Sequence, residues 1–170
     1  MLWHPAYVGI GSNLDEPAGQ VSRALAALAD MPQSRLVAQS ALFGSRPMGP
    51  AEQPDFVNAV AGLLTQMQAA AFFAALRMLE RALGREPPRV RWGARRIDLD
   101  LLLFGALRLD SPELTLPHPG IVQRNFVLYP LLEVAPGLDV PGCGRVADLA
   151  ARVDRAGIWR LDNKSIMHGA

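Results

Sequence analysis

The chain has 170 residues, of which 50% are hydrophobic and 19% are charged, and it contains a single cysteine. This length and composition are typical of one globular domain and exclude a disordered or fibrous protein. The formal net charge of +1 excludes a uniformly basic nucleic-acid-binding surface, so any strong positive field must come from a local cluster. The lone Cys143 excludes an internal disulfide and fits a reducing compartment.

Targeting and membrane segments are not indicated. The N-terminal stretch lacks the basic and apolar regions of a signal peptide, and no apolar run approaches the length of a membrane span. We therefore expect a cytoplasmic protein, with one domain over residues 1–162 and a flexible tail over 163–170.

The first third of the chain alternates between strand and helix patterns. A short apolar run over 6–10, ended by a Gly-Ser-Asn turn, predicts a strand, and helical spacing of apolar residues predicts a helix over 16–30. A second strand is expected over 34–43. The Pro- and Gly-rich stretch 44–55 that follows predicts a long loop, which in compact domains is usually functional or disordered.

The next strand is predicted over 56–65 with two chemically different faces. Alternation along a strand places one apolar set on one face, consisting of Val57, Ala59, Ala61 and Leu63. The same alternation leaves Phe56 and Asn58 together on the other face. A helix marked by apolar residues from Phe72 to Leu83 follows, with Gly84 in a typical C-capping position.

The second half of the chain starts with an arginine-rich loop over 85–96, which contains five arginines and one acid. A strand is expected over 97–104 with a partner around 106–110, and a later helix over 146–153. The order β-α-β-β-α-β predicts an α+β fold of the ferredoxin-like plait type. Its helices pack on an antiparallel sheet, and further helices and strands follow at the C-terminus.

Two aspartates within the strand at 97–104 need an explanation. Residues two apart on a strand share a face, so Asp98 and Asp100 point the same way and repel each other unless a cation lies between them. Paired carboxylates suit Mg²⁺, which takes one or two protein carboxylates and completes its shell with water and phosphate. The alternative is that both pair with arginines on a solvated face of the sheet, and the pattern alone leaves the two open.

The neighbouring arginines favour a phosphate ligand, because guanidinium groups bind phosphate oxygens in a bidentate manner and stay charged at working pH. Taken singly, any one of these arginines is more readily explained by a place in a charged surface loop. The arginines are Arg85, Arg89, Arg91, Arg95 and Arg96.

Other residues carry weaker signals. Phe56 and Asn58 together suit a flat heterocycle, with a ring to stack on and an amide to read its edge, although a half-buried edge strand explains them equally well. His118 lies between two prolines and has the chemistry to donate to a phosphate, but a lone histidine is more often structural. The chain has no P-loop motif, GIGSNL lacks the third glycine of a dinucleotide fingerprint, and no Ser/His/Asp or Cys/His set can be assembled.

Taken together, these motifs resemble the family of 6-hydroxymethyl-7,8-dihydropterin pyrophosphokinases of folate biosynthesis. The resemblance covers nearly the whole chain in the same order, through IGSNL, RPMGPAEQPDFVNAV, LGR, RWGARRIDLDLLLFG, LTLPHPG and QRNFVLYPLLEVAPG. It implies a monomeric Mg²⁺-dependent enzyme in which a pterin hydroxymethyl oxygen attacks the β-phosphorus of ATP, so that diphosphate is transferred and AMP leaves. No nucleic-acid or membrane partner is implied.

The resemblance also implies roles for individual residues. Asp98 and Asp100 would hold two Mg²⁺ ions that arrive with ATP, and Arg85 and Arg95 would act with them as catalytic residues. The implied ATP-binding residues are Arg85, Arg91, Trp92, Arg95, Ile97, Thr115, His118 and Arg124. The implied pterin-binding residues are Ser45, Met48, Phe56, Asn58, Trp92 and Phe126. The loops at 44–55 and 84–96 would close over the two substrates, as loops do in that family.

Some positions depart from the family pattern. Ala94 stands where proline is frequent and Arg96 where threonine is frequent, while Glu113 and Gly120 replace basic side chains found in many members. Pro87 and Pro88 also occupy a loop that is often more basic. These departures predict a lighter phosphate clamp and bear on ATP affinity more than on the type of reaction.

Three alternative functions stay open. An RNA-binding plait module would share the topology, but it predicts aromatic and basic residues on the sheet face, where this chain has two aspartates. A degraded relative that only binds a partner is disfavoured because both aspartates, Arg85 and Arg95 are present. A metal-dependent phosphotransferase with a different acceptor can be excluded only by substrate trials.

Overall fold

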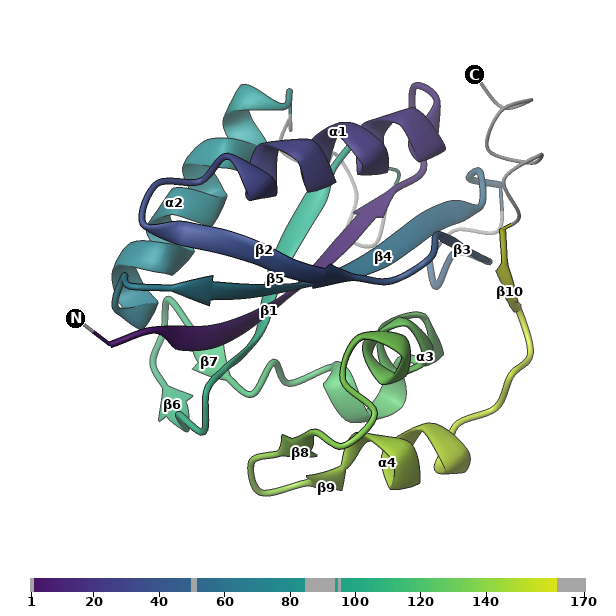
Figure 1. Ribbon diagram of the computed structural model, residues 1–170. Coiled ribbons are helices and arrows are strands. Elements are labelled where there is room, and N and C mark those ends of the chain that lie inside the picture. The colour runs from purple at the N-terminus through teal and green to yellow at the C-terminus, as the bar shows by residue number, and fades with distance from the viewer. Residues whose placement is uncertain (1, 50–51, 85–93, 95, 162–170) are drawn as a thin grey trace.

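The computed structural model describes residues 2–49, 52–84, 94 and 96–161. Its strands (Figure 1) are β1 (His4–Ser12), β2 (Ser34–Gln39), β3 (Phe43–Ser45), β4 (Phe56–Thr65), β5 (Asp98–Phe104), β6 (Leu109–Asp110), β7 (Thr115–Leu116), β8 (Asp139–Val140), β9 (Gly144–Arg145) and β10 (Ile158–Arg160). Its helices are α1 (Pro17–Ala29), α2 (Ala69–Ala82), the short 3-10 turn η1 (Ile121–Gln123), α3 (Asn125–Val134) and α4 (Val146–Arg152).

The strands β1, β2, β3, β4, β5 and β10 form one sheet with antiparallel pairing throughout. Its order is β10-β3-β4-β1-β5, and β2 pairs with β4 next to β3. Both long helices cross one face of this sheet, whereas α3 and α4 lie on the opposite side (Figure 1). The chain therefore folds into an α+β structure of three layers.

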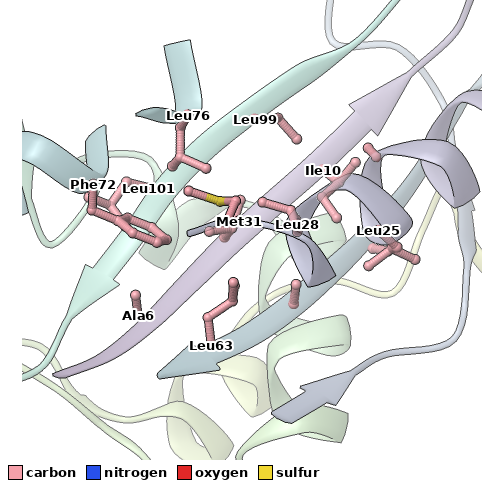
Figure 2. Packing of buried hydrophobic residues seen from close by; sticks show 14 of the residues in the cluster. Ala6, Ile10, Leu25, Leu28, Met31, Leu63, Phe72, Leu76, Leu99 and Leu101 are labelled. Carbon is pink, nitrogen blue, oxygen red and sulfur yellow. The ribbon is translucent and has the colours of Figure 1, made fainter. Parts of the chain in front are cut away.

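Each face of the sheet has its own apolar core. The larger core lies under α1 and α2, where side chains such as Ile10, Leu28 and Phe72 are almost fully buried (Figure 2). The smaller core joins the opposite face to α3 and α4 through residues that include Leu102 and Leu128. Burying one such side chain contributes about 1.5–3 kcal/mol, so both helical layers are held mainly by apolar contact.

Several predictions from the sequence are confirmed. The strand predicted over 56–65 is β4, and its apolar face packs in the larger core as expected. The residues of this face are Val57, Ala59, Ala61 and Leu63. The helix α2 ends just before Gly84, whose φ of +95° is the left-handed conformation that glycine adopts readily at a helix C-terminus.

Other element predictions are wrong. The single strand expected over 34–43 is broken into β2 and β3 at Ser40, whose side-chain hydroxyl accepts a hydrogen bond from the backbone N–H of Val60. The second piece reaches Ser45, so the first two residues assigned to the loop at 44–55 belong to a strand. The partner of β5 is expected around 106–110, but residues 109–110 form β6 and pair with β7 instead.

The C-terminal part adds elements around α3. The short hairpin β8–β9 leads into α4, and β10 then returns to pair with β3 at the edge of the sheet. The tail predicted over 163–170 lies outside the described residues. Within the described part of the chain, no helix has the length and apolar character needed to cross a membrane.

Candidate active site

A pocket of about 400 Å³ opens on the face of the sheet that carries α3. Four strands and the start of α3 contribute to its wall. The lining residues are Gly9, Ile10, Gly11, Ser45, Arg46, Met48, Phe56, Asn58, Ala59, Asp98, Asp100, His118, Arg124, Phe126 and Val127. The wall thus combines aromatic and apolar groups with two carboxylates and two guanidinium groups.

The floor of this pocket is a stretch of backbone in the central strand β1. Gly11 pairs with Asn58 of β4 on one side and with Asp98 of β5 on the other, while Gly9 pairs with Asp100. Cross-strand partners share a face of the sheet, so the amide and the two carboxylates project on either side of a strip that has no side chain. A Cβ atom on Gly11 would lie 3.3 Å from Oδ1 of Asn58, which leaves little room for any larger residue.

The two aspartates lie on β5, at the edge of the sheet. Both are partly exposed, and the intervening Leu99 is fully buried in the larger core, so the strand turns its acidic side to the pocket and its apolar side to α2. This alternation is the one expected from the sequence. The pocket therefore contains two neighbouring carboxylates on one face of a strand.

A buried carboxylate supports β5 from behind. Oε2 of Glu80, on α2, accepts a hydrogen bond from the backbone N–H of Leu99 at 2.8 Å, and Oε1 forms an ion pair with Arg77 at 2.6 Å. Glu80 is only 1% exposed, so this ion pair offsets part of the cost of burying its charge. Nothing in the sequence pattern singles out Glu80, because a single acid within an apolar helix pattern looks like a surface residue.

On the opposite side of the floor, Asn58 is held in place by its neighbours. Its Nδ2 donates to the Ser45 hydroxyl at 2.7 Å, and both side chains are at least 95% buried. Phe56 shares the face of Asn58 and lines the same pocket. The structure thus places an aromatic ring beside a fixed amide, with Met48 exposed at the rim.

The start of α3 supplies a second aromatic ring and a guanidinium group. The guanidinium carbon of Arg124 lies 5.8 Å from the centre of the Phe126 ring, and both residues line the pocket. A Cβ atom on Gly120 would lie 2.6 Å from Nε of Arg124. The missing side chain at Gly120 therefore leaves the space that Arg124 uses.

His118 lies at the carboxylate end of the pocket. Its Nδ1 accepts a hydrogen bond from the backbone N–H of Gly120 at 3.1 Å, which leaves Nε2 as the donor of the neutral ring. Burial is the main cause that lowers the pKa of His118, and Arg124 and Arg77 lower it further, whereas the charge of Asp100 opposes them. A neutral imidazole with an N–H donor is the favoured form.

Two predicted ATP-binding residues do not line the pocket. The side chain of Ile97 is fully buried in the larger core, and Thr115 lies on β7 opposite Asp110. Four further predicted residues lie outside the described part of the chain: Arg85, Arg91, Trp92 and Arg95. The other nine predicted site residues line this pocket: Ser45, Met48, Phe56, Asn58, Asp98, Asp100, His118, Arg124 and Phe126.

Arg96 has a different partner from the one its neighbourhood suggests. It forms an ion pair with Asp15 at 2.8 Å, at the loop between β1 and α1, and both side chains are largely exposed. Arg46 lines the pocket instead, although the sequence carried no signal for it beyond its place in the loop at 44–55. Which arginines line the pocket thus depends on the path of the chain, which the positions of charged residues in the sequence do not reveal.

The donor set of the pocket fits Mg²⁺. Asp98 and Asp100 present oxygen ligands, the hard donors that Mg²⁺ prefers, and both face open pocket space in which substrate phosphates and water can complete the coordination. Among the described residues, no group of three or more His, Cys, Asp or Glu side chains forms a larger metal cage. The arrangement suits ions bound jointly by two carboxylates and a ligand.

Known proteins match this chain along most of its length. A family model described as 7,8-dihydro-6-hydroxymethylpterin-pyrophosphokinase (HPPK) matches residues 7–136. A 2-amino-4-hydroxy-6-hydroxymethyldihydropteridine pyrophosphokinase of Pseudomonas aeruginosa is 46% identical over 155 residues, which cover 91% of this chain and 95% of that protein. The protein of the same name from Haemophilus influenzae is 39% identical over 144 residues, covering 85% and 89%.

Solved structures share the fold at low sequence identity. A structure described as HPPK-DHPS in complex with substrates aligns with a TM-score of 0.73 at 10% identity, covering 95% of this chain and 47% of that chain. The wild-type Plasmodium falciparum HPPK-DHPS with pteroate aligns with a TM-score of 0.68 at 12% identity, covering 89% and 42%. This chain spans less than half of those longer chains.

Proposed function

Because the chain belongs to the 7,8-dihydro-6-hydroxymethylpterin-pyrophosphokinase (HPPK) family, we propose that it transfers diphosphate from ATP to 6-hydroxymethyl-7,8-dihydropterin. The hydroxymethyl oxygen attacks the β-phosphorus, and AMP leaves. The product is the dihydropterin diphosphate of folate biosynthesis. The observation that carries the proposal is one pocket that combines a carboxylate pair with an aromatic and amide-lined wall.

The aromatic wall suits the pterin. Phe56 and Phe126 would stack on the flat ring system, and Asn58 would hydrogen-bond to its polar edge. The hydrogen bonds that Nδ2 of Asn58 donates to the Ser45 hydroxyl and the Phe43 carbonyl support this role, because an amide fixed in this way presents its Oδ1 acceptor without a further loss of side-chain freedom. Met48 would cover the rim.

The carboxylate end suits the triphosphate. Asp98 and Asp100 would hold two Mg²⁺ ions, which when bound neutralise the phosphate charge and polarise the transferred group. Asp98 and Asp100 would also orient the nucleotide so that its β-phosphorus faces the hydroxymethyl group. Most of the catalysis then comes from positioning and charge, so that no protein nucleophile is needed.

Basic and neutral groups would complete the nucleotide site. Arg124 would donate to phosphate oxygens, and Nε2–H of neutral His118 would donate a hydrogen bond without adding charge. Thr115 and Ile97 remain proposed ATP contacts. Because the side chain of Ile97 is buried, this residue would contact ATP through its backbone. The roles of four further residues are supported by the resemblance alone. Arg85 and Arg95 would be catalytic and would bind ATP. Arg91 would bind ATP, and Trp92 would contact both ATP and the pterin.

We also propose that residues 1–162 form one catalytic domain with a ferredoxin-like core and act as a monomer. The core would be β1-α1-β2-β4-α2-β5. Its strand order of β5-β1-β4-β2 with antiparallel neighbours supports this assignment. Size exclusion with light scattering tests the oligomeric state.

The test of the function is a reaction of the purified chain with ATP, Mg²⁺ and 6-hydroxymethyl-7,8-dihydropterin, followed by phosphorus NMR. We expect AMP and a pterin diphosphate, and no turnover without Mg²⁺. ADP as the product would replace diphosphate transfer by simple phosphorylation. An absence of nucleotide consumption would favour a degraded relative or a binding module.

A further inference from the structure

The C-terminal segment 154–161 lies beyond the region matched by the family model and contacts β3 and the start of α3, both of which contribute residues to the pocket. We call this segment the C-terminal strap. On one side its strand β10 pairs with β3, with Ile158 opposite Ser45 and Trp159 opposite Gly44. A hydrogen bond from the Arg46 N–H to the Gly157 carbonyl extends this pairing. The strap therefore covers the outer edge of the strand that carries Ser45.

Trp159 fits against β3 in a specific way. A Cβ atom on Gly44 would lie 2.3 Å from Cε2 and Nε1 of Trp159, so the indole occupies the space that any other residue at Gly44 would need. Ser45 follows directly and faces the pocket, where its hydroxyl accepts the hydrogen bond from Asn58. Packing of Trp159 thus acts on the strand that holds the Ser45–Asn58 pair.

The other end of the strap is tied to the start of α3. Nδ2 of Asn125 donates to the carbonyl oxygens of Asp154 and Ala156, at 2.9 and 3.0 Å. Asn125 directly precedes Phe126, through which α3 lines the pocket. The guanidinium of Arg155 also lies 5.1 Å from the centre of the Tyr129 ring on the same helix.

A third contact joins the same two sides. Nε of Arg160 pairs with Oε2 of Glu133 on α3 at 3.0 Å, and Oε1 of Glu133 accepts the backbone N–H of Ala41 just before β3. The side chain of Arg160 is largely exposed, so its ion pair adds little by itself. Its geometry still orients the strap between α3 and β3.

We propose that the C-terminal strap sets the distance between the Phe126 side and the Ser45–Asn58 side of the pocket. Trp159 and Asn125 are then positioning residues for pterin binding, although neither lines the pocket. The inference rests on the proposed function, because it takes the bound ring system to be a pterin. Loosening either contact widens the space around the ring and leaves the carboxylate end unchanged.

The test compares Trp159→Ala and Asn125→Ala with the wild-type protein in steady-state kinetics. We expect the KM for the pterin to rise between about tenfold and a hundredfold, since small displacements of bound groups have effects of this size. The KM for ATP should change by less than about twofold. Trp3→Ala is the matched control, because Trp3 is 39% exposed, similar to the 40% of Trp159, and it lies outside the pocket lining.

A double-mutant cycle separates positioning from general loosening. Phe126→Ala removes the side chain that the strap positions, so adding Trp159→Ala to it should raise the pterin KM much less than in the wild-type background. Equal effects in both backgrounds, equal losses for ATP and pterin, or an unchanged pterin KM would each overturn the inference. If Trp159→Ala does not fold, Asn125→Ala decides, because it removes only two hydrogen bonds at the surface. A wild-type protein that turns over no pterin would instead refute the proposed function.

Discussion

Oε2 of Glu80 lies 2.8 Å from the backbone nitrogen of Leu99 and accepts its hydrogen bond. The peptide group that donates this bond joins Asp98 to Leu99, so a buried side chain on α2 holds the backbone between the two pocket carboxylates. Strand β5 is at the edge of the sheet, and no further strand among the described residues pairs with it to fix this N–H. The relative orientation of Asp98 and Asp100 therefore depends on a third carboxylate that lies behind the strand.

Glu80→Ala is expected to lower the free energy of unfolding by about 1–3 kcal/mol, because the Leu99 N–H loses its acceptor. Glu80→Gln keeps an acceptor oxygen and should retain most of this stability. Chemical denaturation measures the difference, and amide hydrogen exchange at Leu99 reports the bond itself. Glu113→Ala, exposed between β6 and β7, is the control. Unchanged exchange at Leu99 in Glu80→Ala would contradict this account.

Asp98→Ala and Asp100→Ala should each reduce turnover at least about a hundredfold, because the charge stabilisation that bound Mg²⁺ supplies is worth several kcal/mol. The fold should persist, since both aspartates are partly exposed and interactions of exposed carboxylates contribute little to stability. Phosphorus NMR gives the rate and thermal unfolding gives the midpoint, with Asp110→Ala on β6 as a control. A sharp fall of the midpoint in the metal-free variants would favour structural ion pairs instead.

Gly11→Ala should impair pterin binding, because the added Cβ would lie 3.3 Å from Oδ1 of Asn58 and displace an amide that Ser45 holds. We expect a rise of the pterin KM by about tenfold with little change in the KM for ATP. Gly19→Ala is the control, since no atom lies within 4 Å of its added Cβ and alanine favours the helix α1. Equal behaviour of the two variants would show that the floor tolerates side chains.

The pKa of His118 should lie below its usual value of about 6.5 in the metal-free, nucleotide-free protein. Asp100→Asn should lower it further and Arg124→Gln should raise it, because these charges act in opposite directions. Proton NMR titration, assigned with His118→Gln, measures all three values. A pKa above 6.5, or a rise in Asp100→Asn, would contradict the prediction.

The lowered pKa of His118 also makes the stability of the fold depend on pH. Since the folded state favours the neutral ring, the contribution of His118 is fully present above a pH of about 6.5 and is lost as the pH falls through that value toward the lower folded pKa. Wild-type protein should therefore lose more stability than His118→Gln between pH 7 and 5. Parallel curves of unfolding free energy against pH for the two proteins would contradict this prediction.

The sequence alone predicted the parts of the fold and site that rest on local periodicity. Alternation in β4 separated the core face from Phe56 and Asn58, and alternation in β5 placed Asp98 and Asp100 on one face. The break at Ser40 was not predictable in this way, because it depends on a hydrogen bond to Val60 in another strand. Long-range partners of this kind leave no periodic signal.

The C-terminal strap was also not predictable from local sequence patterns. Residues 158–160 are too short and too mixed to predict a strand, and they pair only because β3 offers a free edge. The fit of Trp159 against Gly44 joins residues more than a hundred positions apart. Likewise, Glu80 gains its role from the burial of α2 against β5, which the helix pattern alone does not contain.

The glycine floor has a consequence for inhibitor design. A compound that rests on Gly9 and Gly11 meets main-chain atoms, which no point substitution can remove. Resistance at these positions can arise only by adding atoms, and any added atom on Gly11 also crowds the amide at Asn58. We expect selection for resistance to spare the floor and to act on rim residues such as the exposed Met48, where side chains can change without blocking the substrate.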